Sequence, residues 1–414
     1  MQEDEIVTEA PEQRRILRVL VAAQVLSGAG LAAGITVGAL LAQDMLNTTG
    51  WAGLPTAMFT IGSAAAAAGV GRLSDRLGRR AGLAAGYAVG AVGCAGVVVA
   101  AVLGNVPLLF VAFLVYGAGT ATNLQARYAG ADLADPARRG RAVSVVLVST
   151  TLGGVLGPNL VSPMGALAQA WGIPRLAGPF LLAGVAYAVA AVVLWALLRP
   201  DPLLLARQRA TGPAAAGATP DPAADGGSST GVVLGASIMV LTQLVMVAIM
   251  TMTPIHMAAH GRGLGAAGLV IAIHVAAMFL PSPISGLLVD RFGRVVVAVA
   301  SGMTLLVAGV LAALAPGDSL VLLAVALALL GLGWNLGLVS GTAIITDSVP
   351  LARRATTQGT VDVGIAVSGA GAGLASGLVV AAAGFPTLAL AGGACALAII
   401  PIVALTGRRA PSRS

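Results

Sequence analysis

Charged residues are scarce in this chain: they make up 9% of its 414 residues, and lysine is absent. A soluble domain carries about 25% charged residues, so the composition excludes an ordinary soluble enzyme and a nucleic-acid-binding domain. The two cysteines, Cys94 and Cys395, lie far apart and form no CxxC pair. This excludes a disulfide-stapled secreted module and a thiolate metal clip. No nucleophile–base set or dinucleotide fingerprint appears in context, so we expect no enzyme activity.

Hydrophobic residues make up 57% of the chain and are spread along its whole length. A membrane-spanning helix needs about 20 apolar residues, so the chain has room for roughly twelve such helices with short connections. The stretch from Arg199 to Ser229 is instead rich in Pro, Ala, Gly and Ser, which predicts a flexible linker. Six apolar runs lie on each side of it, at 16–41, 52–70, 81–103, 107–128, 142–162 and 178–198, and at 231–257, 265–285, 296–315, 320–345, 357–382 and 387–406.

The arginines predict the orientation of these helices. With the N-terminus in the cytoplasm, 21 of the 23 arginines fall on the cytoplasmic side, and only Arg175 and Arg262 fall outside. Cytoplasmic loops of membrane proteins carry such an excess of basic residues. The net charge of +7 therefore indicates membrane orientation, and we expect no nucleic-acid partner. The lysine-free, Ala- and Gly-rich composition fits a GC-rich bacterial genome, so we expect a bacterial inner-membrane protein with both termini in the cytoplasm.

Two loop segments repeat at a constant distance along the chain. The segment GRLSDRLGRR at 71–80 recurs as GLLVDRFGRV at 286–295, so that Asp290 follows Asp75 by 215 residues. The segment DPARR ending at Arg139 is echoed by PLARR ending at Arg354, again 215 residues later. One offset for two loops predicts two six-helix halves, at 1–198 and 231–414, joined by a cytoplasmic linker at 199–230. Such halves place a substrate site between them near the middle of the membrane.

The pattern G-x-L-x-D-R-x-G-R-R after the second helix, with a degenerate copy after the eighth, resembles the loop motif of the major facilitator superfamily. The resemblance covers nearly the whole chain. It implies an all-α membrane protein with twelve transmembrane helices in two pseudo-symmetric halves. It also implies a secondary transporter that moves a small solute by alternating access, with the lipid bilayer and that solute as partners and without a cofactor.

The repeated loops predict a latch between the halves. Gly71 and Gly78 permit a tight turn, and Asp75 can face the N-terminus of a neighbouring helix, whose dipole favours an anion. The arginines stay in the headgroup region and pair across the halves, in a contact that one conformation breaks. Alternatively, they mark only the cytoplasmic side, and the glycines make only turns. The residues of the predicted latch are Gly71, Asp75, Arg76, Gly78 and Arg79 in the first half and Gly286, Asp290, Arg291, Gly293 and Arg294 in the second.

Ionisable residues inside the membrane are few, and such residues are costly there and usually functional. Of the 16 acidic residues, only Asp362 lies clearly within a predicted span. It can carry a proton or pair with an arginine at the inner gate; the alternative is a structural contact near the headgroups. Arg127, at the inner end of the fourth helix, is the other candidate for a proton or inner-gate residue. It is expected to pair with Asp132 or to extend its side chain to the interface.

Methionine and histidine gather in one window: six of the 11 methionines and all three histidines lie between residues 239 and 278. Met246 and Met250 form M-x-x-x-M on the seventh helix, and His274 and Met278 form H-x-x-x-M on the eighth, so each pair shares a helical face. Because the two helices form an antiparallel hairpin turning near Arg262, Met250 is expected level with His274, and Met246 level with Met278. If the faces meet, three thioethers and one imidazole converge near mid-membrane.

Thioether and imidazole ligands suit Cu(I), whereas zinc and magnesium prefer thiolates or carboxylates. Neutral ligands of moderate affinity also let a carrier release its cargo. The predicted metal ligands are Met246, Met250, His274 and Met278. Capture of the substrate nearer the outer mouth is expected of Met252, His256 and Met257. Pro254 is expected to interrupt the seventh helix there.

These two motifs resemble those of the CcoA-like copper importers of the superfamily, which carry M-x-x-x-M on the seventh helix and H-x-x-x-M on the eighth. The segment TMTPIHM at 251–257 is also similar to that group. The resemblance implies copper uptake, with copper as the substrate. Relatives close to that group are associated with riboflavin uptake.

Two other classes of function stay open beside copper uptake. A Met-rich cavity with one histidine also suits a flat organic substrate such as riboflavin, or an amphiphilic drug exported in exchange for protons, because methionine packs apolar pockets flexibly. A membrane receptor or assembly factor that moves nothing is an alternative of another class. The linker and the tail from Gly407 to Ser414 are short for a signalling domain, which argues against it.

Overall fold

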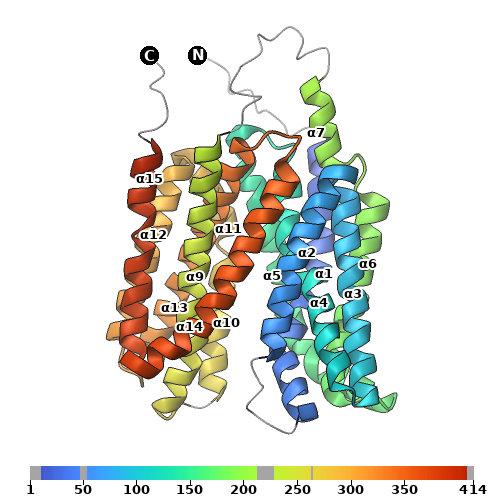
Figure 1. Cartoon of the computed structure of the whole chain (residues 1–414), viewed down its shortest axis with the longest axis vertical. Coiled ribbons are helices and arrows are strands. Elements are labelled where there is room, and N and C mark those ends of the chain that lie inside the picture. Colours follow the sequence, from blue (N-terminus) through green and yellow to red (C-terminus); the bar gives the residue numbers. More distant parts are fainter. Residues whose placement is uncertain (1–10, 47–53, 212–227, 263, 408–414) are drawn as a thin grey trace.

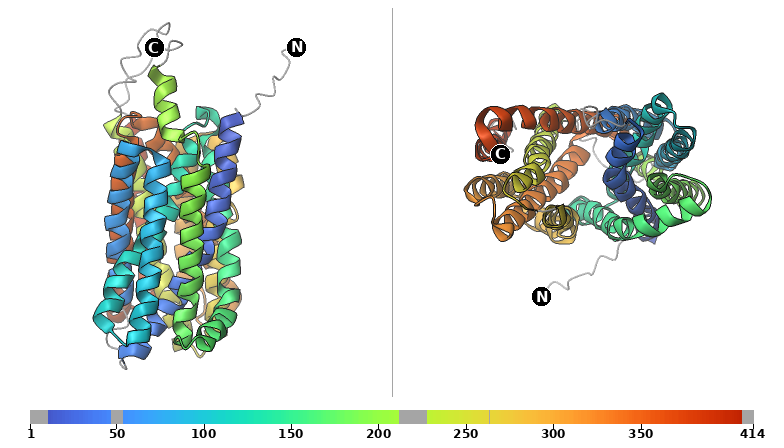
Figure 2. Two further views of the ribbon diagram at one scale, coloured as in Figure 1. Left: turned by 90° about the vertical axis from the view of Figure 1, so that its right-hand side faces the viewer. Right: turned by 90° about the horizontal axis from the view of Figure 1, so that it is seen from below.

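The computed structural model describes residues 11–46, 54–211, 228–262 and 264–407, and every regular element within them is a helix. The helices form two bundles that lie side by side (Figure 1), as the end-on view also shows (Figure 2). The first bundle, the N-terminal half, contains α1 (Pro11–Leu46), α2 (Leu54–Leu77), α3 (Arg79–Leu103), α4 (Val106–Ala131), η1 (Pro136–Arg138), α5 (Arg139–Ala170), η2 (Arg175–Ala177) and α6 (Gly178–Leu197).

The second bundle, the C-terminal half, contains α9 (Ser229–Ala259), α10 (Leu264–Phe279), α11 (Ser282–Phe292), α12 (Arg294–Leu314), α13 (Leu320–Ser348), α14 (Arg354–Ala396) and α15 (Ile399–Gly407). α14 forms the eleventh span and begins the twelfth, because it bends at Gly384, where φ is +82°. α15 completes the twelfth. The predicted all-α membrane fold is confirmed, and eight helical stretches of the described residues are by themselves long and apolar enough to cross a membrane.

The predicted eighth span is two helices, α10 and α11, which meet at Pro281. Proline has no N–H to donate, so the helix ladder is lost there. Asn335 of α13 compensates, because its side-chain amide donates to the Met278 carbonyl and to the Ser282 hydroxyl, both at 2.7 Å. The break predicted at Pro254 is wrong, since α9 continues through Pro254 to Ala259. An isolated proline removes one hydrogen bond, and the tertiary contacts of α9 keep the rest of the helix.

The first part of the predicted flexible linker is helical, which corrects the prediction there, whereas its residues 212–227 lie outside the described residues. Residues Pro202–Thr211 form the helix α7. Asp201 accepts hydrogen bonds from the backbone N–H groups of Leu203 and Leu204, which is the geometry of an N-cap, and Pro202 occupies the favoured first position. The same carboxylate also accepts from the backbone N–H of Arg80 at 2.7 Å, so it fastens α7 to the start of α3.

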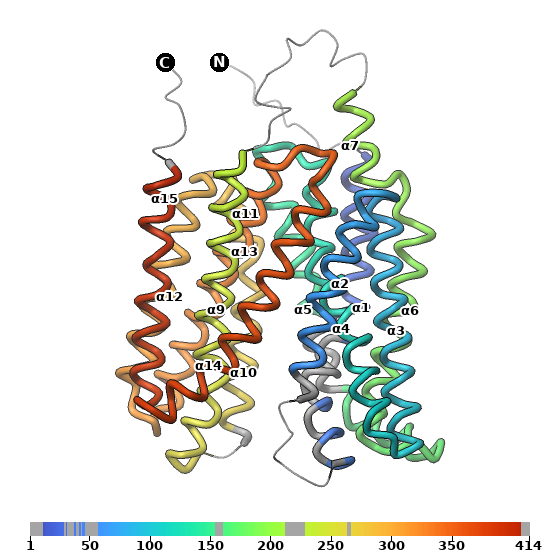
Figure 3. Tube along the Cα trace, viewed as in Figure 1, coloured from blue at the N-terminus to red at the C-terminus, as the bar shows by residue number. Residues whose placement is uncertain are grey.

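α1 begins, α15 ends and α7 lies at one end of the molecule (Figure 1). We call it the arginine-rich end, because the loops that contain or adjoin many of the arginines lie there: α2–α3, α4–α5, α11–α12 and α13–α14. The hydrogen bonds and ion pairs that join the two halves gather at this end. α14 starts against α2 of the N-terminal half and then runs obliquely along α9 of the C-terminal half (Figure 3).

Candidate functional site

Asp75, near the end of α2, lies at the N-terminus of α14 in the opposite half. Its carboxylate accepts hydrogen bonds from the backbone N–H groups of Ala355 at 3.0 Å and Thr356 at 2.7 Å. The first turn of a helix leaves such groups unpaired, and the helix dipole favours a negative charge there. Arg207 of α7 adds an ion pair to Asp75 at 3.0 Å.

Asp290, near the end of α11, makes the equivalent contact in the other direction. It accepts from the backbone N–H groups of Gly140 at 2.8 Å and Arg141 at 2.9 Å, in the first turn of α5. Each partner in this contact follows or precedes its counterpart in the Asp75 contact by 215 residues. The sequence repeat is therefore reproduced as a pair of reciprocal contacts between the halves.

Two clusters of three charges surround these caps. In the first, Asp132 at the end of α4 pairs with Arg79 of its own half at 2.7 Å and with Arg354 of the other half at 3.8 Å. The Asp132 and Arg79 side chains are 0% and 1% exposed. Arg79 also donates to the side chain of Gln358 on α14.

The second cluster repeats the first at the same offset. Asp347 at the end of α13 pairs with Arg294 of its own half at 2.6 Å and with Arg139 of the other half. The Asp347 side chain is 22% exposed, so the second cluster is more accessible to solvent than the first. The caps and the two clusters together form what we call the symmetric layer.

The glycines of the loops have two different roles. Gly78 and Gly293 adopt φ of +91° and +88°, which a side chain disfavours, and they make the turns between helices. Gly71 makes no turn, which corrects that prediction: it lies within α2, and a Cβ there would approach the Ala355 carbonyl oxygen to 2.8 Å. A Cβ on Gly286 of α11 would approach the Gly140 carbonyl oxygen of α5 to 2.6 Å. These two glycines permit close helix approach across the halves.

Arg76 and Arg291 of the predicted latch lie apart from these contacts. Both are exposed, and in the described part of the chain neither forms an ion pair. Their placement fits the alternative prediction, in which the loop arginines only mark the cytoplasmic side of the membrane.

One ion pair lies deeper than the symmetric layer. Arg127 of α4 pairs with Asp362 of α14 at 2.7 Å, and both side chains are buried. Arg127 also donates to the Thr342 hydroxyl of α13 at 3.0 Å, so it reaches two helices of the opposite half. The two contacts predicted for Arg127 are wrong, because Asp132 pairs with Arg79 and Arg354 and the Arg127 side chain is 0% exposed. Its role as an inner-gate residue stays a prediction. Of the alternatives for Asp362, the structure shows the pairing with an arginine.

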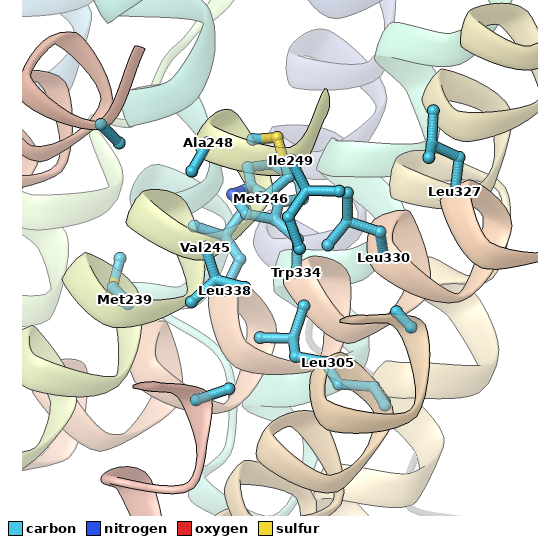
Figure 4. Close-up of a cluster of buried hydrophobic side chains, with 14 of the residues drawn as sticks. Met239, Val245, Met246, Ala248, Ile249, Leu305, Leu327, Leu330, Trp334 and Leu338 are labelled. Atoms are coloured by element: carbon cyan, nitrogen blue, oxygen red, sulfur yellow. The ribbon is translucent and has the colours of Figure 1, made fainter. Parts of the chain in front are cut away.

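The methionine face of α9 packs against α13. A Cβ on Gly341 would touch the Met239 side chain, and one turn further Gln243 accepts a hydrogen bond from the Trp334 indole N–H at 2.7 Å. Met246 follows Gln243 by three residues, is 4% exposed, and lies in the cluster that contains Trp334 (Figure 4). Met250, one turn beyond, is half-buried.

The histidine face of α10 also meets α13. His274 is fully buried, and its ring Nδ1 lies 2.8 Å from the Leu327 carbonyl oxygen. A carbonyl only accepts, so Nδ1 carries the proton and Nε2 is left with a lone pair. Nε2 is buried and has no hydrogen-bond partner among the described residues. Met278 is half-buried beside Asn335.

The predicted hairpin register is consistent with these contacts, and each of the two faces makes contacts with α13. Met246 and Met278 both lie near the Trp334–Asn335 level of α13. α9 and α10 contact each other much less than either contacts α13. No hydrogen bond among the described residues joins the methionines of α9 to His274. The convergence of the four predicted ligands thus stays a prediction.

The outer group is not a row of free ligands. Met252 and Met257 are buried in the core of the C-terminal half. The His256 ring stacks on Phe385 with centroids 4.3 Å apart and lies 4.4 Å from the ring of His260. Within the described residues, no group of three or more His, Cys, Asp or Glu side chains lies close enough to hold a metal.

Sequence reasoning missed an aromatic group beside the methionines. Trp334 is bonded to Gln243, and the Phe279 ring lies 5.8 Å from it at a steep angle of 74°. The sequence did contain a signal for this group: Trp334 and Gln243 each lie among apolar residues of a predicted span. A buried indole N–H needs a hydrogen-bond partner, and the glutamine side chain can supply one.

A polar network in the N-terminal half was missed as well. The Gln24 amide donates to Thr150 at 3.1 Å, and its carbonyl accepts from the Tyr87 hydroxyl at 2.6 Å. Asn123 donates to the Ser27 hydroxyl at 2.8 Å. These residues come from α1, α3, α4 and α5, and together they place amides and hydroxyls inside an otherwise apolar bundle.

Comparison with known proteins agrees with this architecture. The family model described as Major Facilitator Superfamily matches residues 20–256 and 234–414. The chain is 56% identical to an uncharacterized MFS-type transporter, YdeG, of Bacillus subtilis, over 94% of this chain and 91% of that protein. It is 31% identical to the riboflavin transporter RfnT of Brucella anthropi, over 86% of each chain. Among solved structures, the human organic anion transporter MFSD10 matches with a TM-score of 0.77 at 16% identity, over 95% of this chain and 100% of that one.

Proposed function

The chain belongs to the major facilitator superfamily, and we propose that it carries a small organic solute of the riboflavin class: a flat ring system bearing hydrogen-bonding groups. Transport proceeds by alternating access across a bacterial inner membrane, with the arginine-rich end in the cytoplasm. The conformation described here is then the one closed toward the cytoplasm, because the two halves are joined at that end.

The Trp334–Gln243–Phe279 group carries this proposal. An indole ring held in place by a hydrogen bond offers a rigid surface for a flat ring, and a few polar groups among apolar ones are typical of ligand sites. The group lies on α9, α10 and α13, next to the break between α10 and α11. The similarity to a protein named as a riboflavin transporter supports the same class of solute.

Copper uptake is the second candidate, and one observation favours it. His274 donates its Nδ1 proton to a backbone carbonyl and keeps Nε2 free, which is the arrangement that orients a histidine ligand toward a metal. Met246, Met250 and Met278 would have to supply the thioethers. The polar residues of the N-terminal half would then have no part in the site.

Uptake in cells distinguishes the two candidates. We would measure labelled riboflavin and total copper in a bacterial strain that lacks its own carriers for both, at matched membrane levels of each variant. The organic-solute proposal predicts riboflavin uptake that Trp334→Leu and Gln243→Leu abolish. Copper accumulation that Met250→Ala and His274→Ala abolish would instead support the second candidate.

A matched control separates binding from general damage. Trp171 is 64% exposed at the end of α5, so Trp171→Leu should leave uptake unchanged. Wild-type cells that accumulate neither compound would contradict both candidates.

A further inference from the structure

The buried pair of Arg127 and Asp362 is present once, whereas the acids of the symmetric layer are present twice. At the 215-residue offset, Arg127 corresponds to Thr342 and Asp362 to Leu147, so neither charge has a charged counterpart. We infer that Asp362 is a proton-binding carboxylate that couples transport to proton movement. The inference rests on the transport function proposed above and names its coupling ion.

All the hydrogen-bond partners of Asp362 come from the opposite half. Its Oδ1 accepts from Arg127 at 2.7 Å and from the Tyr128 hydroxyl at 3.1 Å, and both donors belong to α4. Its Oδ2 is buried and has no hydrogen-bond partner among the described residues. Asp362 therefore depends on the contact between the halves for every bond it makes.

Arg127 depends on that contact much less. Besides Asp362 and Thr342, it donates to the Leu124 carbonyl and to the Tyr128 hydroxyl at 2.8 Å, both on its own helix. When the halves part, Arg127 keeps these two acceptors and Asp362 keeps none. Asp362 is consequently the member of the pair whose charge must be removed.

Alternating access requires the halves to part at the arginine-rich end. When the halves part, an ionised Asp362 loses its ion pair with Arg127 and both of its hydrogen bonds, and this loss of free energy is larger than the loss for a neutral carboxyl group. A proton from water forms an O–H bond with the free Oδ2, which neutralises Asp362 and weakens its attraction to Arg127. The ionised form thus stabilises the state closed at the arginine-rich end, and the protonated form permits the state open there. The proton binds from the outer side and leaves to the cytoplasm.

The charges around this pair are already engaged elsewhere. Arg79 faces it from α3 but is bound to Asp132. α9 packs along α14 and has no ionisable side chain before His256. The other charged groups on the helices packed against α14 lie at the arginine-rich end: Arg72, Asp75 and Arg76 of α2, Asp132 of α4, Arg294 of α12 and Asp347 of α13, with Arg353 and Arg354 at the start of α14 itself. Among the described residues, Tyr128 is the one further ionisable group that is hydrogen-bonded to Asp362.

The test follows the conformation without any solute. Leu77 and Phe292 are 59% and 55% exposed at the ends of the equivalent helices α2 and α11. Leu77→Cys and Phe292→Cys therefore accept spin labels once Cys94→Ala and Cys395→Ala have removed the native thiols. Distances between the labels would be measured in lipid nanodiscs from mildly acidic to mildly alkaline pH. The ratio of open to closed forms should rise with acidification by up to about tenfold per pH unit, the limit for one proton.

Variants locate the proton. Asp362→Asn should favour the open form at every pH, and Asp362→Glu should keep the pH dependence with a shifted midpoint. Asp347→Asn is the matched control, because it removes an acid of the symmetric layer: it should lower the closed population and keep the pH slope. A wild-type slope in Asp362→Asn, or a pH-insensitive wild type, would overturn the inference.

Transport in proteoliposomes, with riboflavin as the probe, separates this inference from the proposed function. Wild type should accumulate riboflavin under an inward proton gradient, and Asp362→Asn should still exchange it but lose the accumulation. No riboflavin transport, together with an intact pH response of the labels, overturns the proposed solute and supports the proton site. Equal accumulation by Asp362→Asn overturns the proton site and supports the proposed solute.

Discussion

The symmetric layer and the deeper part of the membrane-spanning region differ in how well they keep the 215-residue repeat. In the symmetric layer, each cap and each charge cluster occurs twice at one offset. Deeper in the membrane the equivalent positions diverge: Arg127 corresponds to Thr342, Gln24 to Met239, and Trp334 to Gly119. A contact that has to close and open the whole interface can be built from one repeated unit. A site for a solute or a proton needs particular groups at one place, which the repeat does not preserve.

Burial differs even between the two copies inside the symmetric layer, and this gives the largest expected effect. Asp132→Asn should leave the fully buried Arg79 without its ionic partner, which costs about 3–5 kcal/mol. Asp347→Asn affects partners that are 15% and 32% exposed, and we expect about 1 kcal/mol or less. The measurement is the midpoint of denaturant unfolding of the purified protein in detergent.

The two variants act as each other's control, because they remove the same group from equivalent positions. Equal losses of stability would show that burial does not distinguish the copies. A greater loss of stability for Asp347→Asn would contradict the expectation that the more buried ion pair contributes more.

Much of the fold could be predicted from the sequence, because apolar length and arginine placement are strong signals in a membrane protein. Within the described residues, each of the twelve predicted runs corresponds to one helix or to two successive helices. The errors concern single residues whose effect depends on packing. Pro254 and Pro281 look alike in sequence, yet only Pro281 divides a helix. The helix α7 was not predicted, because the composition around it is typical of a linker. Asp201 and Pro202 nevertheless form a recognisable N-terminal capping pair.

The candidate site could be predicted less well. Asp75 could be placed against a helix N-terminus, since its loop position and charge leave few other partners. The partner of Arg127 could not be predicted, because Asp362 lies 235 residues away and only tertiary structure brings them together. The methionine and histidine spacing indicates the depth of these side chains, but it does not show how each helix is turned toward α13, which both helices contact more than they contact each other.

The second-largest expected effect concerns the close approach of α2 and α14, which belong to opposite halves. Gly71→Val would place a side chain against the backbone of α14, because an added Cβ would lie only 3.0 Å from the Gly359 Cα. Overpacking of this kind costs about 1–3 kcal/mol, and it acts only on the state closed at the arginine-rich end. The spin-label pair at 77 and 292 should therefore report a shift toward the open form.

Gly69→Val provides a close control for this variant. Gly69 lies on the same helix, and a Cβ there meets no other atom within 4 Å. The same residue type thus enters α2 without touching α14. If both variants opened the arginine-rich end equally, the close approach at Gly71 would not be what limits closure.

The smallest effect tests a second asymmetry of the symmetric layer, which is the contact that the linker helix α7 makes with only one of the two caps. Arg207 of α7 binds Asp75 and also donates to the carbonyls of Leu351 and Ala352 in the opposite half, whereas Asp290 has no such partner among the described residues. Asp75→Asn should therefore open the arginine-rich end further than Asp290→Asn, by up to about 1 kcal/mol, because the Arg207 side chain is partly exposed. In an Arg207→Ala background this excess should vanish, as a double-mutant cycle with the same spin labels would measure. Persistence of the excess without Arg207 would place the asymmetry in the caps themselves, and the linker helix would then have no part in holding the halves together.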